Sequence, residues 1–289
     1  MTCRSACRTA RGGACGARGT WLDAVNFYRG LARVPPVEER PDLSAGDARH
    51  AAYMVGTDSL GHDEDAGSPL YSAEGAQAAT TSDVVASSDP GATDVWAIEF
   101  LVAAPFHALA LLDPRLTATG FGIAHDMRGP IETAAAVDVL SARAAPPAGL
   151  RFPVLFPSRG AIMPLTRFPG GETPDPLTSC PGYAAPAGAP LVAQLGTGSS
   201  PPAIAAHRLA RDGVPVEHCV FDETTYVNPD PALQSLGRAV LAPRNAIVIV
   251  PRAPLAPGSY AASVDVGARR LRWRFVVRCA RPGTRTTGD

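Results

Sequence analysis

A short segment rich in alanine and proline, Ala144–Gly149, divides this chain into two parts of different character. Before it, apolar residues recur at three- and four-residue steps, which is typical of helices that bury one face. After it, Pro and Gly dominate through residue 190, and short apolar runs then alternate with turn residues. Because 289 residues is a length that suits two domains, the break predicts an α+β domain followed by an all-β domain.

The first part predicts helices on both faces of a hairpin sheet, that is, an α/β/α sandwich. Ser44, with Asp47 three positions later, is expected to cap the second helix, and Pro105 to end the third. Residues 56–92 follow no period and predict a long loop of the kind that carries function. The expected elements are helices at 21–32, 44–55 and 93–102, a helical turn at 106–109, and paired strands at 119–123 and 134–140.

The second part, residues 150–280, predicts an immunoglobulin-like β-sandwich. Asp212-Gly213 between apolar runs is a hairpin signal, and residues 246–250 form a buried-type strand. Tyr260 lies in a segment that resembles the tyrosine corner of such sandwiches. The last strand is the clearest, with Leu271, Trp273, Phe275 and Val277 on one face and Arg270, Arg272 and Arg274 on the other.

Composition excludes some partners. The formal net charge is −1, so no electrostatic footprint for nucleic acid is expected. All 26 basic residues are Arg, which together with abundant Pro and Gly indicates the coding bias of a GC-rich genome rather than a binding signal. No stretch approaches the ~20 apolar residues that span a bilayer, so no transmembrane segment is expected.

The N-terminal segment, residues 1–19, predicts a disordered leader, and residues 281–289 a disordered tail. The leader is basic but has no apolar core, so it is not a signal peptide as written. Either the protein is cytoplasmic, or a misassigned start site has removed an export signal.

Of the six cysteines, three lie in the predicted leader and three in the second part of the chain. Cys3, Cys7 and Cys15 lie in the leader at a spacing that matches no zinc motif. Cys180, Cys219 and Cys279 allow one disulfide in the second part, and Cys180 with Cys219 is the expected pair.

Common catalytic motifs are absent: there is no Walker loop, no His-Glu-x-x-His, no Gly-x-Ser-x-Gly elbow and no Cys-x-x-Cys. Four polar residues of the first part remain as candidates, His62, Glu74, Glu99 and His107. Two imidazoles and two carboxylates suit a divalent metal such as zinc, and they also suit proton transfer. Their spacing alone carries no signature, so ordinary polar residues on loops are the competing interpretation. His50 is expected to be a packed or surface residue of its helix, and Asp63, Glu64 and Asp65 to form a solvated loop.

Several short segments resemble those of the CAP superfamily (cysteine-rich secretory protein, antigen 5 and pathogenesis-related proteins). The matching segments, in chain order, are Asn26-Phe27-Tyr28-Arg29 with Pro35-Pro36, Ala48–Met54, Gly61-His62, Tyr71–Gly75, Ala104-Pro105-Phe106-His107 and Leu112–Gly122. Their order and spacing agree with the family over about residues 20–142, so a CAP domain is expected at 20–145.

The resemblance implies a cleft that holds two histidines and two acidic residues. His62 and His107 match the family's histidine positions, and Glu74 takes the place of the glutamate in its Gly-Glu-Asn motif. Glu99 resembles the glutamate of Trp-x-x-Glu but lies closer to His107 than in the family, and Asp94 is the alternative. Family members are mostly exported, which favours an extracellular location over a cytoplasmic one.

Two functions from different classes follow from this resemblance. The first is a non-enzymatic extracellular binding protein whose cleft takes zinc, calcium or a small lipid-like or peptide ligand. The second is a metal-dependent hydrolase, a peptidase or esterase, in which His62 and His107 hold the metal and Glu74 is the general base. The lack of a nucleophile or zincin motif favours the binding protein.

Overall fold

The computed structural model describes residues 19–278 except 147, 198 and 199. Cys3, Cys7, Cys15 and Cys279, most of the predicted leader and the predicted tail lie outside the described residues. The first part comprises α1 (Trp21–Ala32), β1 (Glu38–Glu39), α2 (Pro41–Thr57), α3 (Ala73–Ala79), β2 (Ser82–Ser87), α4 (Asp94–Ala103), α5 (Pro105–Leu111), β3 (Ala118–Thr119), β4 (Phe121–His125) and β5 (Thr133–Asp138).

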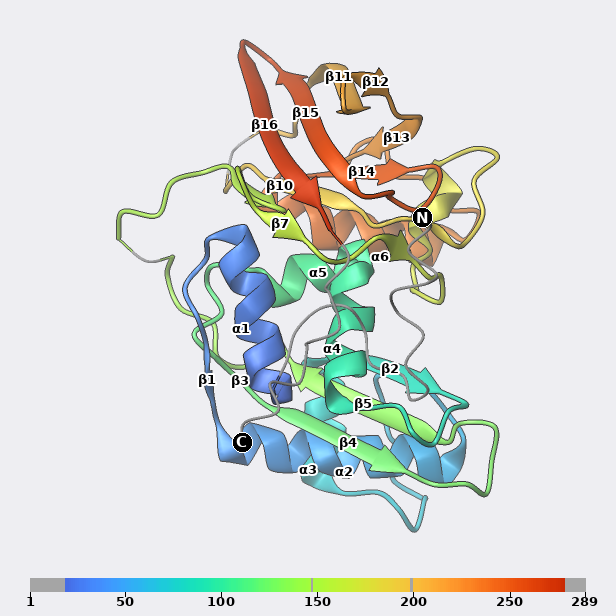
Figure 1. Cartoon of the computed structure of the whole chain (residues 1–289). Coiled ribbons are helices and arrows are strands. Elements are labelled where there is room, and N and C mark those ends of the chain that lie inside the picture. Colours follow the sequence, from blue (N-terminus) through green and yellow to red (C-terminus); the bar gives the residue numbers. More distant parts are fainter. Residues whose placement is uncertain (1–18, 147, 198–199, 279–289) are drawn as a thin grey trace, which may run out of the picture.

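The first part is layered, with helices on both faces of the antiparallel sheet β2-β5-β4 (Figure 1). Helices α2 and α3 cover one face, and α1, α4 and α5 form the layer on the other. Successive side chains of β2 point alternately to the two helical layers. Val84 packs with Met54 of α2, whereas Val85 packs into the opposite core, and Asp83, which shares the face of Val85, therefore points toward the α4–α5 layer. The α+β class and the pairing of the two predicted strands are confirmed.

Helix α2 begins at Pro41, three residues before the predicted start, so the prediction that Ser44 is its N-cap is wrong. Proline suits the first helical position, where its missing amide hydrogen has no partner to lose. The Ser44 hydroxyl instead donates to Glu39 and accepts the amide of Phe121, which ties the helix to the sheet. The approach is close: a Cβ at Gly122 would lie 2.0 Å from the backbone nitrogen of Ala48.

The predicted loop at residues 56–92 contains two regular elements, α3 and β2. Ser72 caps α3 by accepting the amide of Gly75 at 3.0 Å. Strand β2 was not recognised because its residues are at least partly buried on both faces, so apolar and polar residues do not alternate along it.

The second part contains two larger sheets, with strand orders β13-β14-β10-β6 and β12-β11-β15-β16-β7, and a small two-stranded sheet, β8-β9. Its elements are β6 (Val154–Phe156), β7 (Ile162–Met163), β8 (Arg167–Phe168), β9 (Ala187–Gly188), β10 (Leu191–Gln194), β11 (Ile204–Arg211), β12 (Val214–Pro215), β13 (His218–Phe221), α6 (Pro231–Leu241), β14 (Ala246–Pro251), β15 (Gly258–Val266) and β16 (Arg269–Val277), with short 3-10 helices η2 (Pro176–Ser179) and η3 (Ala242–Arg244). The all-β expectation is wrong in one element, α6. The immunoglobulin-like assignment stays a prediction.

Local predictions for the second part are confirmed. Asp212-Gly213 joins β11 to β12 with positive φ at both residues, the geometry of a tight hairpin turn. The Tyr260 hydroxyl donates to the carbonyl of Ala256 at 2.9 Å, as in a tyrosine corner. In β16, Leu271, Trp273, Phe275 and Val277 are buried, and Arg270, Arg272 and Arg274 are exposed.

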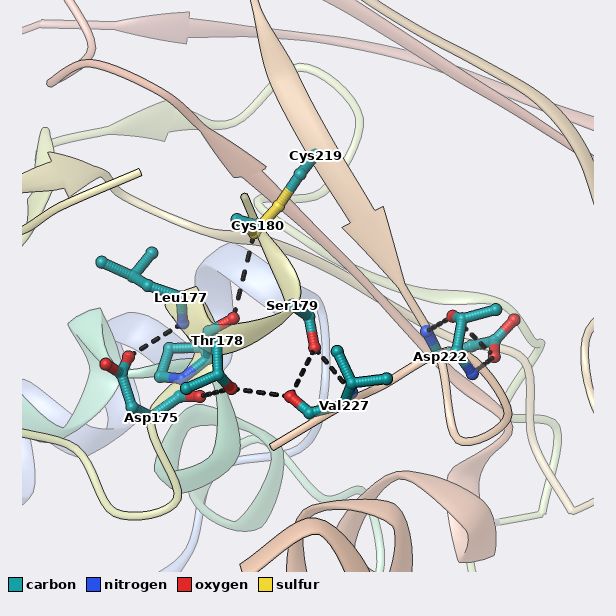
Figure 2. Close-up of a disulfide and its surroundings, with 10 residues drawn as sticks. Asp175, Leu177, Thr178, Ser179, Cys180, Cys219, Asp222 and Val227 are labelled. Atoms are coloured by element: carbon teal, nitrogen blue, oxygen red, sulfur yellow. Dashed lines mark hydrogen bonds between the residues drawn. A yellow bond between two sulfur atoms is a disulfide. The ribbon is translucent and has the colours of Figure 1, made fainter. Parts of the chain in front are cut away.

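The predicted disulfide between Cys180 and Cys219 is confirmed (Figure 2). It joins the end of η2 to β13 with Cα atoms 5.6 Å apart, inside the usual range for a bridge. Beside it, the Thr178 and Ser179 hydroxyls donate to the carbonyl of Val227, so the η2 segment is held at two points.

The two parts share one hydrophobic core, which runs from α1, α4 and α5 into both larger sheets of the second part. Polar contacts cross the same boundary. Gln194 of β10 donates to the carbonyl of Leu112 at 3.0 Å, and Arg244 of η3 pairs with buried Asp113 at 2.8 Å. The modules therefore form one packed body. Within the described residues, no single helix has the length and apolar content to cross a bilayer, although α4 and α5 meet that criterion jointly as a pair bent by 111°.

Candidate functional site

His107 lies in the first turn of α5 and is held by a carboxylate from the second part of the chain. Its Nδ1 is 2.9 Å from Oε1 of Glu172, and the same oxygen accepts the amides of Phe106 and His107 at 2.8 and 2.9 Å. The Glu172 side chain is fully buried and that of His107 is 15% exposed. Glu172 thus caps α5 and pairs with the histidine across the module boundary.

Charge in this cluster is set by Asp83, His107 and Glu172. Burial lowers the pKa of His107, but Asp83 and then Glu172 outweigh burial and raise it to about 9, so the imidazole is protonated at neutral pH. Burial raises the pKa of Asp83 to about 6, partly opposed by His107. Burial also raises the pKa of Glu172, and His107 pulls it back down. The result is a buried imidazolium influenced by two carboxylates.

His62 lies in the loop between α2 and α3, and its Nδ1–H donates to the carbonyl of Ala79, the last residue of α3, at 3.2 Å. Burial lowers its pKa, and the charges of His107 and His50 lower it further. The charge of His107 thus contributes to the lowered pKa of His62, although the two residues are far apart in sequence. One imidazole is neutral and the other is charged at pH 7.

The other predicted residues contact different neighbours. Glu74 is exposed on α3, 4.0 Å from Nε of Arg49. Glu99 is buried on α4, and its Oε1 accepts the Tyr28 hydroxyl at 2.9 Å in the core. Asp94, the alternative, accepts the amide of Trp21 at 2.9 Å.

Among the described residues, no group of three or more His, Cys, Asp and Glu side chains is placed to hold a metal ion. A zinc or calcium site formed by His62, Glu74, Glu99 and His107 stays a prediction.

The loop that carries His62 is fixed by a second buried pair. His50 Nδ1 lies 3.0 Å from Oε1 of Glu64, and its Nε2 donates to the carbonyl of Gly61 at 3.0 Å. The second oxygen of Glu64 accepts the amide of Ser72 at 3.1 Å. Glu64 is thus a fully buried anchor, and its expected place in a solvated loop was wrong.

Sequence reasoning missed Asp83 and Glu172. Glu172 follows Gly170-Gly171, two residues with φ of +95° and +84° that turn the chain tightly. A Cβ at Gly171 would lie 3.4 Å from Phe100 of α4, so the loop packs directly on the first module. The paired glycines were the available sign of a turn, but nothing in the sequence indicated that the next residue reaches His107.

An open hollow lies elsewhere on the first module, between the start of α1, the segment before α4, and β4. It has a volume of about 610 Å³, and its walls include Trp21, Phe121 and Ile123. The rings of Trp21 and Phe121 stack with centroids 5.2 Å apart. Polar groups at its edge come from Asp94 and His125. We call this feature the CAP hollow; none of His62, Glu74, Glu99 and His107 lines it.

The described geometry defines an α/β/α sandwich in which His107, at the start of a short helix, pairs with the buried carboxylate of Glu172. Residues 22–130 match the family model described as CAP: Cysteine-rich secretory protein family. The chain therefore contains a domain of the CAP superfamily, as the sequence resemblance predicted. A search of curated proteins found no match.

Proposed function

We propose that this protein is a non-enzymatic, exported binding protein whose CAP domain takes a small lipid-like ligand in the CAP hollow. The observation that carries this proposal is the hollow itself. Its volume of about 610 Å³ falls in the range of ~300–1,000 Å³ that is typical of small-molecule sites. The stacked Trp21 and Phe121 offer an apolar wall, while Asp94 and His125 can orient a polar end of the ligand.

The histidine cluster supports binding over hydrolysis. His107 is paired with Glu172 and protonated at neutral pH, so it is not available as a general base. Glu74, the proposed base of the alternative hydrolase, is exposed, with its carboxylate 4.0 Å from Arg49. No observation on the described residues favours the hydrolase.

Export is supported by the disulfide between Cys180 and Cys219. Such bonds persist in oxidising compartments and are rare in the cytosol. The family's usual secretion points the same way.

The test uses N-phenyl-1-naphthylamine, a neutral apolar dye whose fluorescence rises in apolar sites. We expect saturable binding to the wild type and at least about a tenfold loss of affinity in Trp21→Ala, because a large part of the apolar wall is removed. Phe27→Ala, which truncates a partly exposed ring that does not line the hollow, is the matched control and should bind like the wild type. Equal binding by Trp21→Ala would contradict the site. Ester or peptide turnover that disappears in Glu74→Gln would contradict the non-enzymatic assignment.

A further inference from the structure

The outer face of the five-stranded sheet carries a groove lined by arginines, which we call the arginine groove. Its volume is about 680 Å³, and Arg159, Arg208, Arg272 and Arg274 contribute to its walls. This groove lies on the second module, away from the CAP hollow. The strands that carry it, β11, β15 and β16, are at the upper end of the molecule in Figure 1.

Strand register explains how the arginines come together. Arg208 of β11 pairs with Ser263 of β15, and Ser263 pairs with Arg272 of β16. Arg274 is opposite Ala261 and follows Arg272 on the same face. The small side chains of β15 thus form the base of the groove, between the arginine side chains of β11 and β16. By strand geometry, Arg272 and Arg274 are about 7 Å apart along β16, and Arg208 is about 10 Å across the sheet.

Among the described residues, these guanidinium groups form no ion pair with a carboxylate. All four residues are exposed, and no ion pair joins any of them to an Asp or Glu within the described part of the chain. Two carboxylates of this sheet lie near the groove. Asp265 is bound by Arg270 and is also influenced by Arg272, and Asp212, next to Gly213, lies 4.0 Å from Arg211. Four arginines that form no ion pair within the described residues therefore share one hollow in a chain whose net charge is −1.

The wall formed by residues 158–161 is held rigidly. The amide of Gly160 donates to the carbonyl of Arg274 at 2.8 Å, and the guanidinium of Arg159 donates to the carbonyl of Arg272. The carbonyl of Arg159 accepts from the guanidinium of Arg33, the residue that follows α1, at 2.7 Å, which anchors this wall to the CAP domain. The groove is thus part of the packed body and does not need a partner to form.

We infer that the arginine groove binds an acidic polysaccharide, a chain that carries carboxylate or sulfate groups at regular intervals. Guanidinium groups form paired, charge-assisted hydrogen bonds with such oxyanions. Single-stranded nucleic acid fits less well, because its sites combine positive charge with exposed aromatic rings for base stacking. The one aromatic residue at the groove, Trp273, points into the core and is 3% exposed. Export to an oxidising compartment also favours a glycan over nucleic acid as the polyanion that is encountered.

The test measures binding of oligogalacturonate and of dextran sulfate to the full chain by microscale thermophoresis, with neutral dextran and oligo-dT as comparison ligands. The variant is Arg208→Gln/Arg274→Gln, whose side chains make no recorded hydrogen bond or ion pair in the described structure. Its matched control is Arg151→Gln/Arg167→Gln, which removes the same charge at two exposed positions outside the groove.

We expect the wild type and the control to bind at least one acidic glycan, with affinity that falls as salt screens the charges. The groove variant should bind about tenfold more weakly, the scale of losing two charge-assisted contacts. Unchanged binding by the groove variant, an equal loss in the control, equal binding of neutral dextran, or tighter binding of oligo-dT would each overturn the inference. Because the CAP hollow is on the other module, dye binding to the groove variant should stay at the wild-type level. The two proposals can therefore fail separately.

Discussion

Replacing Glu172 with Gln removes the carboxylate that holds His107 while it keeps the size of the side chain. The amide oxygen of Gln still accepts the backbone amides of Phe106 and His107, so the change isolates the charge. The pKa of His107 rises from 6.5 to about 9 in the folded protein, which corresponds to about 3 kcal/mol at ~1.4 kcal/mol per unit. Asp83 and Glu172 share this effect, so we expect the variant to lose about 2 kcal/mol of unfolding free energy at pH 6.5.

The sign of the pH dependence follows from the raised pKa of His107. A raised folded-state pKa gives stabilisation that is fully present below 6.5 and is lost as the pH rises through about 9. The difference between the wild type and Glu172→Gln should therefore shrink between pH 6.5 and 9.5.

Urea unfolding at several pH values measures this difference. Glu217→Gln, the same substitution at an exposed pair with Arg252, is the matched control and should change stability by less than about 1 kcal/mol at every pH. A loss in Glu172→Gln no greater than in this control, or a difference that grows toward pH 9.5, would refute the reasoning.

Three further expectations concern the fold. Removing the disulfide with Cys180→Ala/Cys219→Ala should lower the free energy of unfolding by about 4 kcal/mol, because the bond closes a loop with a sequence separation of 39. Urea unfolding with and without reductant measures this loss. If reduction of the wild type does not lower its stability by a similar amount, the expectation is wrong. Asp47 is fully buried, and burial raises its pKa to about 7, so the wild type should lose stability as the pH rises from about 4 to 7. The Asp47→Asn variant should not show this loss and should be about 2 kcal/mol more stable than the wild type at pH 8. An unchanged dependence of stability on pH would count against this expectation. Gly122→Ala should lower the free energy of unfolding by about 3 kcal/mol, measured by thermal unfolding, because its Cβ would lie 2.0 Å from the backbone of α2. In the control Gly30→Ala, the new Cβ meets nothing within 4 Å, so stability should change little. Equal effects of the two substitutions would disprove the close-packing argument.

The elements that sequence reasoning found are those whose signal is local. Helix α1 has a capping box between Thr20 and Asp23, and β16 alternates buried apolar residues with exposed arginines. The turn at Asp212-Gly213 is also set by two adjacent residues. Helix α6 carried local signals as well, since Asp230 caps it and Pro231 opens it, but they were overlooked within a segment interpreted as all β.

The candidate site was predicted only in part, because its contacts depend on tertiary packing. Short motifs made His62 and His107 candidates through the family resemblance, and that the two histidines share a cleft stays a prediction. The residues that contact His107 did not follow from these motifs. Glu172 is 65 residues from His107 and comes from the other module, so no fixed spacing relates them. Asp83 faces the α4–α5 layer only because of the register of β2, which the sequence did not reveal.

The central claim is that His107 is held as an imidazolium by buried carboxylates, one of them from the second module. Titrating the full chain with labelled histidine, followed by NMR and assigned with a His107→Gln variant, measures this directly. The account predicts a titration near pH 9 for the wild type and a shift toward 6.5 in Glu172→Gln. A wild-type His107 that titrates at or below 6.5 would contradict it.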